Sequence, residues 1–210
     1  MLTAAAGSAD AVAYLGLGRV FTANMTGNLV LLGVAIGQGR LEGSIRSAIA
    51  FAGFGLGVLT GARLTAERQT AIWPHSVTRV MFVELGLLVI LAASWEIAGD
   101  QPTALVLDFL IALSAGAMGM QAAATRRLGV AGVTTTFVTG TLTSLIAELA
   151  GMSPDWSRWT LWAATLACIV IGAAAGVAVF IGWRPGAPLV ATVLVGIVAA
   201  TATWLTRAHE

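Results

Sequence analysis

Long apolar stretches separated by short polar linkers occupy most of the chain. Their approximate bounds are residues 2–17, 25–36, 44–62, 77–98, 103–124, 136–150, 159–182 and 188–205. A helix needs about 20 residues to cross the hydrocarbon core of a bilayer, and several of these stretches approach that length. They are continuous and do not alternate in polarity, which favours helices over a transmembrane β-barrel. The pattern predicts an all-α, polytopic membrane protein with one integral membrane domain over residues 1–210.

The second and sixth stretches are shorter than the others, and each follows a polar segment of similar sequence. Residues 20–32 read VFTANMTGNLVLL, and residues 133–145 read VTTTFVTGTLTSL. At a constant offset the two segments share these pairs of identical residues: Val20/Val133, Thr22/Thr135, Thr26/Thr139, Gly27/Gly140, Leu29/Leu142 and Leu32/Leu145. Interrupted hydrophobic segments in corresponding positions of two halves are typical of transporter binding sites. We therefore predict two repeats, 1–100 and 101–210, each with a broken half-helix after a Thr-Gly motif.

The relative direction of the two repeats stays open at this stage. Four crossings per half would make the repeats parallel, whereas three crossings and one re-entrant segment would make them inverted. If every stretch crosses, seven arginines lie on one side and four on the other, and the positive-inside rule places both termini outside. That count favours parallel repeats, while two opposed half-helices are easier to build from inverted ones.

Composition supports a membrane protein and argues against several other classes. Hydrophobic residues make up 58% of the chain and charged residues only 10%, with a mean hydropathy of +0.89, whereas soluble domains carry about 25% charge. The net charge of +1 gives no reason to expect a nucleic-acid partner. The single Cys168 cannot form an intrachain disulfide, and the two histidines, His75 and His209, suggest no metal cluster. We expect no enzyme activity, no cofactor and no metal, and we expect the lipid bilayer as a partner.

The repeated Thr-Gly positions are the first candidates for chemistry. Glycine at the start of a helix allows close approach of a ligand, and a helix N-terminus offers unpaired N–H groups and partial positive charge. Two such ends facing each other would form a polar site in the middle of the membrane. Its residues would be Thr26, Gly27 and Asn28 in the first half and Thr139, Gly140 and Thr141 in the second. Preceding side chains would line the site or satisfy unwound backbone: Thr22, Asn24, Thr134, Thr135 and Thr136. The alternative is that these residues only cap interrupted helices.

Acidic residues inside apolar stretches form the second group of candidates. They are Asp10, Glu84, Asp108 and Glu148. Ionisable residues within a bilayer normally face the protein interior and often carry protons or pair with a cation. Asp10 and Glu84 are the candidates for proton coupling. The alternative is snorkelling or an ion pair with Arg19, Arg79 or Arg126. Gln121 could bond either unwound backbone or a ligand.

Two long segments carry a resemblance to a known family. They are GSADAVAYLGLGRVFTANMTGNLVLLG at 7–33 and GAMGMQAAATRRLGVAGVTTTFVTGTLTSL at 116–145. On these residues the chain resembles the YoaK-like family of bacterial multi-pass membrane proteins, a domain of unknown function. The resemblance implies importance for Asp10, Asn24, Thr26, Gly27, Asn28, Gln121, Thr135, Thr136, Thr139, Gly140 and Thr141. One departure is that Ala122 stands where the family usually has Asn. The order of extended stretch, Thr-Gly and short helix is also similar to the core of sulfate permeases and nucleobase carriers.

These observations together predict a transporter or channel in the bacterial cytoplasmic (inner) membrane. Its solute would be small and polar, with an anion as one candidate, and would bind between the two half-helix N-termini. Two alternatives stay open, namely a membrane scaffold or accessory subunit and an intramembrane enzyme with a lipid-like substrate. A homodimer is a further hypothesis, because glycine-rich helix faces are available for close packing.

Overall fold

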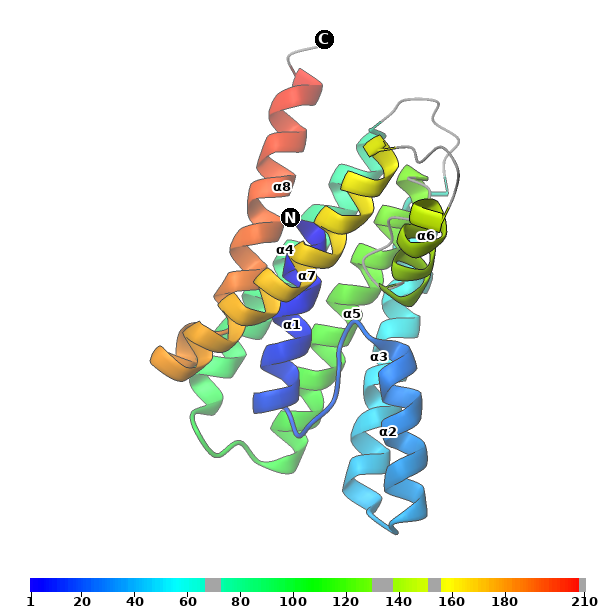
Figure 1. The fold of residues 1–210 in the computed structure, drawn as a ribbon. Helices are drawn as coiled ribbons and strands as arrows, with labels where there is room; N and C mark the ends of the chain where they lie inside the picture. The colour runs from blue at the N-terminus through cyan, green and yellow to red at the C-terminus, as the bar shows by residue number, and fades with distance from the viewer. Residues whose placement is uncertain (67–72, 130–137, 151–155, 208–210) are drawn as a thin grey trace.

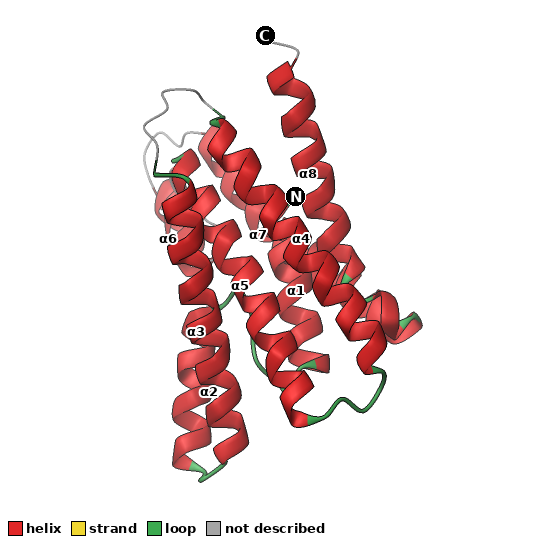
Figure 2. Ribbon diagram, turned by 180° about the vertical axis from the view of Figure 1, so that it is seen from behind, coloured by secondary structure: helices red, strands yellow, loops and turns green. Residues whose placement is uncertain are grey.

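The computed structural model describes residues 1–66, 73–129, 138–150 and 156–207 (Figure 1). Within these ranges the regular structure is entirely helical, which confirms the predicted all-α class (Figure 2). The elements are α1 (Leu2–Gly16), α2 (Met25–Gly37), α3 (Leu41–Leu64), α4 (His75–Ala98), α5 (Ala104–Leu128), α6 (Val138–Ala150), α7 (Trp156–Gly182), the 3₁₀ turn η1 (Arg184–Gly186) and α8 (Leu189–Arg207).

Five helical segments of the described chain are long and apolar enough to cross a membrane. They are α3, α4, α5, the part of α7 from Trp159, and η1 with α8. The predicted multi-pass membrane protein is therefore confirmed at this level. The two predicted short segments are helices of 13 residues each, α2 and α6, and α1 has 15. None of these three reaches the roughly 20 residues of a straight crossing.

Helix contacts follow a rule that relates the two halves of the chain. Helix α1 packs against α7, and α5 packs against α3. Similarly α2 contacts α3 while α6 contacts α7, and α4 contacts α5 while α1 contacts α8. Each of these contacts recurs when α1–α4 are exchanged for α5–α8. The contact between α4 and α8 stays the same under this exchange, because the two helices replace each other, and it joins the two halves.

Glycines bring the two tightest helix pairs together through corresponding contacts. In the first pair, an added Cβ would meet backbone of the facing helix at Gly7 (Ile169) and Gly172 (Ala4) and the backbone and hydroxyl of Ser8 at Gly176. In the second pair the corresponding contacts are Gly119 (Phe54), Gly57 (Gly116) and Gly61 (Met120, with the Ala123 methyl). Small residues at such positions let helix backbones approach closely. The glycine spacing thus fixes how α1 crosses α7 and how α5 crosses α3.

Corresponding helices of the two halves run in opposite directions (Figure 1). In that view α1, α2 and α4 descend and α3 ascends, whereas α5, α6 and α8 ascend and α7 descends. The halves are therefore related as inverted units, the option that the arginine count disfavoured. The count rested on the assumption that every apolar stretch crosses. That assumption is wrong here, since α1 and α2 run in the same direction, and the chain between them turns back.

The corrected path redistributes the arginines between the two ends of the bundle. The end that holds the last turn of α8 also holds the starts of α4 and α7 and the last turns of α3 and α5 (Figure 1). Arginines at that end are Arg63, Arg79, Arg126, Arg127, Arg158 and Arg207. Those at the opposite end are Arg19, Arg40, Arg46 and Arg184, and Arg68 lies outside the described residues. The positive-inside rule now favours a cytoplasmic C-terminal end of α8, contrary to the expectation of both termini outside.

Candidate functional site

The link between α1 and α2 is the most irregular described backbone within the bundle. Helix α1 ends at Gly16, and α2 begins only at Met25. The chain reverses through Gly18 at φ +81° and Arg19 at φ +63°. Arg19 is the non-glycine residue of the described ranges with positive φ, a conformation that is uncommon outside glycine. The extended segment 20–24 then leads back into the bundle and opens α2.

Asp10 holds this extended segment from the neighbouring helix α1. Its Oδ1 atom accepts hydrogen bonds from the backbone N–H groups of Thr22 at 2.7 Å, Ala23 at 2.6 Å and Asn24 at 3.4 Å. Thr22 and Ala23 are buried, and a buried amide without a partner is costly. Asp10 therefore provides acceptor capacity that regular helix would otherwise supply. An ion pair with Arg19, one of the expected alternatives for Asp10, is not among the contacts of the described residues.

Asn28 and Asn24 fix the other side of the same segment. The buried Asn28 amide accepts from the N–H of Phe21 at 2.8 Å and donates to its carbonyl at 2.6 Å. Asn24 is the N-cap of α2, and its Oδ1 accepts from the N–H of Gly27 at 3.1 Å. The Phe21 ring also stacks on Tyr14 with centroids 5.4 Å apart. Three predicted site residues, Asp10, Asn24 and Asn28, thus bind backbone in this structure.

The repeated Thr-Gly positions lie where expected, at the starts of α2 and α6. Thr26 is exposed and Gly27 is partly exposed, while Thr139 and Gly140 are both exposed. Thr141, which corresponds to Asn28, is buried. Helix α2 packs against α3, and α6 packs against α7. The expected Thr134, Thr135 and Thr136 lie outside the described residues, and the Thr22 hydroxyl is buried with no partner within the described part of the chain.

Glu84 and Gln121 form a separate polar pair between α4 and α5. Both side chains are buried, and Gln121 Nε2 donates to Glu84 Oε1 at 2.9 Å. The second carboxylate oxygen, Oε2, has no hydrogen-bond partner in the described ranges. Asp108, in contrast, lies 4.0 Å from the guanidinium of Arg46, in line with the ion-pair alternative but with a different arginine. Gln121 thus contacts a carboxylate and not unwound backbone.

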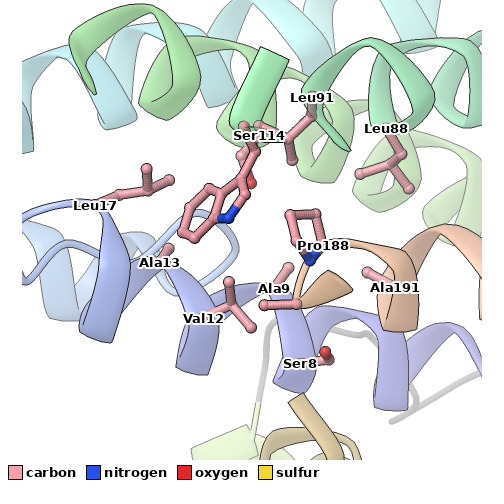
Figure 3. Close-up of a pocket in the computed structure, with 12 residues that line it drawn as sticks. Ser8, Ala9, Val12, Ala13, Leu17, Leu88, Leu91, Ser114, Pro188 and Ala191 are labelled. Carbon is pink, nitrogen blue, oxygen red and sulfur yellow. The ribbon is translucent and has the colours of Figure 1, made fainter. Parts of the chain in front are cut away.

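A small cavity in the bundle core is lined by other residues. Figure 3 shows its lining by Val12 of α1, Leu88 of α4, Ser114 of α5 and Ala191 of α8, with Pro188 directly before α8. Its volume is about 20 Å³, room for roughly one water molecule. The Trp95 indole borders it and donates to the carbonyl of Arg184 at 3.1 Å. We interpret this cavity as a packing gap, because it is too small for an organic solute.

A much larger cleft opens beside the α1–α2 link, at the end of the bundle opposite the last turn of α8. Its volume is about 700 Å³, and α2 and the start of α3 form its other walls. Arg19, Arg40 and Arg46 line it, together with Glu42. None of the predicted site residues borders it. The available sequence signal was a repeated Gly-Arg pair, Gly18-Arg19 and Gly39-Arg40, in which both glycines have positive φ.

Comparison with known proteins agrees with the membrane architecture. The family described as "Protein of unknown function (DUF1275)" matches residues 1–201. The chain is also 38% identical over 151 residues to the UPF0700 transmembrane protein YoaK of Bacillus subtilis (strain 168). That match covers 72% of this chain and 65% of the relative, slightly less than two thirds of the relative's length. No solved structure matches significantly. A match over nearly the whole chain shows that this multi-pass membrane protein belongs to the DUF1275 family, the YoaK-like family expected from its sequence.

Proposed function

We propose that the chain is a membrane transporter or channel for a small polar solute. The solute binds between the N-termini of α2 and α6, and anions are the favoured class because both ends carry partial positive charge. The observation that carries this proposal is the unwound segment before α2, held by Asp10 and Asn28 inside an otherwise apolar helical bundle. Non-helical backbone at membrane depth is tolerated only where protein buries it or where it lines a cavity.

The hydrogen bonds around this segment support a ligand role for the α2 terminus itself. The first N–H groups of a helix have no intrahelical acceptor. Asn24 satisfies the N–H of Gly27 through its side chain and that of Asn28 through its carbonyl. The N–H groups of Met25 and Thr26 precede these positions and have no acceptor among the hydrogen bonds of the described chain. They form the donor pair that we assign to the solute.

The inverted relation of the halves supports transport over a static role. Transporters are commonly built from inverted repeats whose broken helices meet near the bilayer midplane. In this chain matched contacts of α1 with α7 and of α5 with α3 relate the two halves, and corresponding helices run in opposite directions (Figure 1). Rocking of one helix pair against the other would open the site alternately to each side of the membrane. The likeness to sulfate permeases and nucleobase carriers is a fold-level analogy and adds no substrate.

Glu84 is our candidate for proton coupling. Its carboxyl group is buried between α4 and α5, and Oε2 has no protein partner in the described ranges. Intramembrane carboxyl groups in such surroundings commonly mark proton relays. Asp10 is less suited to this task, because three backbone donors occupy its Oδ1 atom.

Transport assays on reconstituted protein test the proposal. The purified chain in liposomes is screened for electrogenic or tracer uptake of small inorganic anions, carboxylates and neutral polar solutes. Gly27→Val and Gly140→Val should each abolish uptake of the solute that the screen identifies. At Gly27 an added Cβ would meet the Phe21 ring and the Asn24 amide, so the new side chain would distort the start of α2. Gly33→Val is the matched control, since an added Cβ at Gly33 meets nothing within 4 Å.

Two results would reject the proposal or its coupling step. If bulky residues at Thr26, Gly27, Thr139 and Gly140 all leave uptake unchanged, the site assignment is wrong. If no solute class is transported and partners copurify, the scaffold alternative replaces it. Glu84→Gln keeps the acceptor for Gln121 but removes the proton site, so it should abolish uptake driven by a pH gradient and preserve solute exchange. Unchanged gradient-driven uptake in that variant would exclude coupling through Glu84.

A further inference from the structure

The cleft beside the α1–α2 link is a second polar feature that the proposed transport site does not use. It is lined by the link itself, by Leu31 and Ala35 of α2, and by residues at the start of α3. Its volume of about 700 Å³ far exceeds the volume of the core cavity, about 20 Å³. The start of α2 with its Thr-Gly motif does not contribute to the lining. The cleft therefore needs its own explanation.

Positive charge dominates the wall of this cleft. Arg19 and Arg40 are exposed, and neither has a carboxylate within 4.0 Å in the described chain. Arg46 is half-buried and lies 3.3 Å from Glu42 and 4.0 Å from Asp108. The acidic partners thus balance Arg46, and the guanidinium groups of Arg19 and Arg40 remain available for another anion. Guanidinium groups bind phosphate and carboxylate oxygens through paired N–H donors.

The backbone brings these arginines together by two turns of the same kind. Gly18 and Gly39 have φ values of +81° and +65°, and each directly precedes one of the available arginines. At Gly18 an added Cβ would meet the Arg46 side chain, with Cδ and Nη1 both 3.0 Å away. Arg19 itself adopts φ +63°. A non-glycine residue held in this region often marks a functional constraint, and here the conformation belongs to a residue that lines the cleft.

We propose that this cleft binds a phosphate-type oxyanion through Arg19 and Arg40, with Arg46 as a third cationic wall. The apolar side chains of Leu31 and Leu41 beside the arginines accommodate an attached organic group. The same chemistry has two sources, namely a dissolved phosphate and the headgroup of an anionic phospholipid at the membrane surface. The inference goes beyond the proposed transport site, since the cleft binds whether or not the helix termini transport.

Binding to the purified full chain tests this proposal directly. One arm titrates inorganic phosphate at constant ionic strength, and the other titrates short-chain dihexanoyl phosphatidylglycerol, with dihexanoyl phosphatidylcholine as the zwitterionic reference. Arg19→Gln and Arg40→Gln should each weaken binding of the active probe about tenfold, as expected for loss of one charge-assisted contact. Saturation by phosphate identifies a dissolved anion, and saturation by the glycerol lipid alone identifies a headgroup.

Two further variants distinguish binding from general effects of charge or folding. Glu42→Gln removes a carboxylate that competes for Arg46, so it should tighten binding about twofold. Arg184→Gln removes an arginine from the same end of the bundle but outside the cleft, where it lies 3.5 Å from Asp100, and should leave binding unchanged. The proposal is overturned if neither probe saturates, or if Arg184→Gln weakens binding as much as Arg19→Gln. Normal binding in a Gly27→Val protein that has lost transport would show that the two sites are independent.

Discussion

The α1–α2 junction and the α5–α6 junction occupy corresponding places but carry different polar residues. On the first side, Asp10 accepts three backbone N–H groups and Asn28 makes two bonds to Phe21. On the second side, Ala122 stands at the position that corresponds to Asp10, and Thr141 at that of Asn28. The glycine contacts and the 13-residue helices are nevertheless duplicated. The helix framework is therefore shared by the halves, while the hydrogen bonds of Asp10 and Asn28, which we call the clamp, come from residues that the second half does not repeat.

The shared framework is where substitutions should have the largest effect, and they should act equally in both halves. Gly57→Leu and Gly172→Leu each place a side chain against backbone of the facing helix. We expect each to cost more than about 3 kcal/mol of unfolding free energy or to prevent folding, since neither backbone can move away locally. Unfolding in mixed micelles measures this. Gly55→Leu on the same helix, where nothing lies within 4 Å, should cost little.

Loss of the clamp gives the next largest effect, and Asp10 is the residue that tests it. Asp10→Ala leaves the N–H groups of Thr22, Ala23 and Asn24 without their acceptor. The expected cost is about 3 kcal/mol, because buried donors keep their full desolvation penalty. Asp10→Asn retains an acceptor oxygen and should recover at least half of that loss in the same unfolding assay. A loss for Asp10→Ala below about 1 kcal/mol would mean that the bonds to Oδ1 do not stabilise the segment.

An exchange of corresponding residues sharpens the comparison further. Asn28→Thr removes a two-bond contact with Phe21 and should cost about 2 kcal/mol. Thr141→Asn makes the opposite exchange at a buried position of the second half, where the larger amide should cost about 1–3 kcal/mol by overpacking. A loss for Asn28→Thr below about 0.5 kcal/mol would mean that the two bonds to Phe21 do not stabilise the segment. The unfolding midpoints of both proteins measure the difference.

The smallest expected effect concerns the cap of α2. Asn24→Ala removes the side-chain acceptor for the N–H of Gly27 and should cost about 1 kcal/mol, as is typical of N-cap residues. Asn24→Asp keeps the acceptor and should be nearly neutral. If Asn24→Ala instead abolishes transport with no loss of stability, Asn24 contacts the solute in addition to capping the helix.

The sequence predicted the helices well because long apolar runs in lipid leave few alternatives. It predicted the short helices α2 and α6 from the polar segments that precede them and from the limited length of their apolar stretches. It could not predict the direction of α2, since the reversal before this helix depends on the positive φ of Gly18 and Arg19. The predicted distribution of arginines between the two sides of the membrane was wrong for the same reason.

The candidate site was predictable in part. The sequence singled out Asp10, Asn24 and Asn28, but their hydrogen-bond partners are backbone groups that no side-chain pattern reveals. The pair of Glu84 and Gln121 joins separate helices and needed the α4–α5 contact to be seen. The arginine cleft was missed because Arg19 and Arg40 are far apart in sequence and line the same cleft only when α2 packs against α3.

The central claim is that the N-termini of α2 and α6 form one site, and a cross-link between them tests it most directly. Gly27→Cys and Gly140→Cys are combined on a Cys168→Ala background and treated with bifunctional thiol reagents of graded length. We predict efficient joining by a short reagent, at about the 7 Å limit of a direct disulfide or slightly beyond, and protection by the transported solute. Joining only by long reagents, with no protection by any solute, would contradict the claim and make the repeat purely architectural.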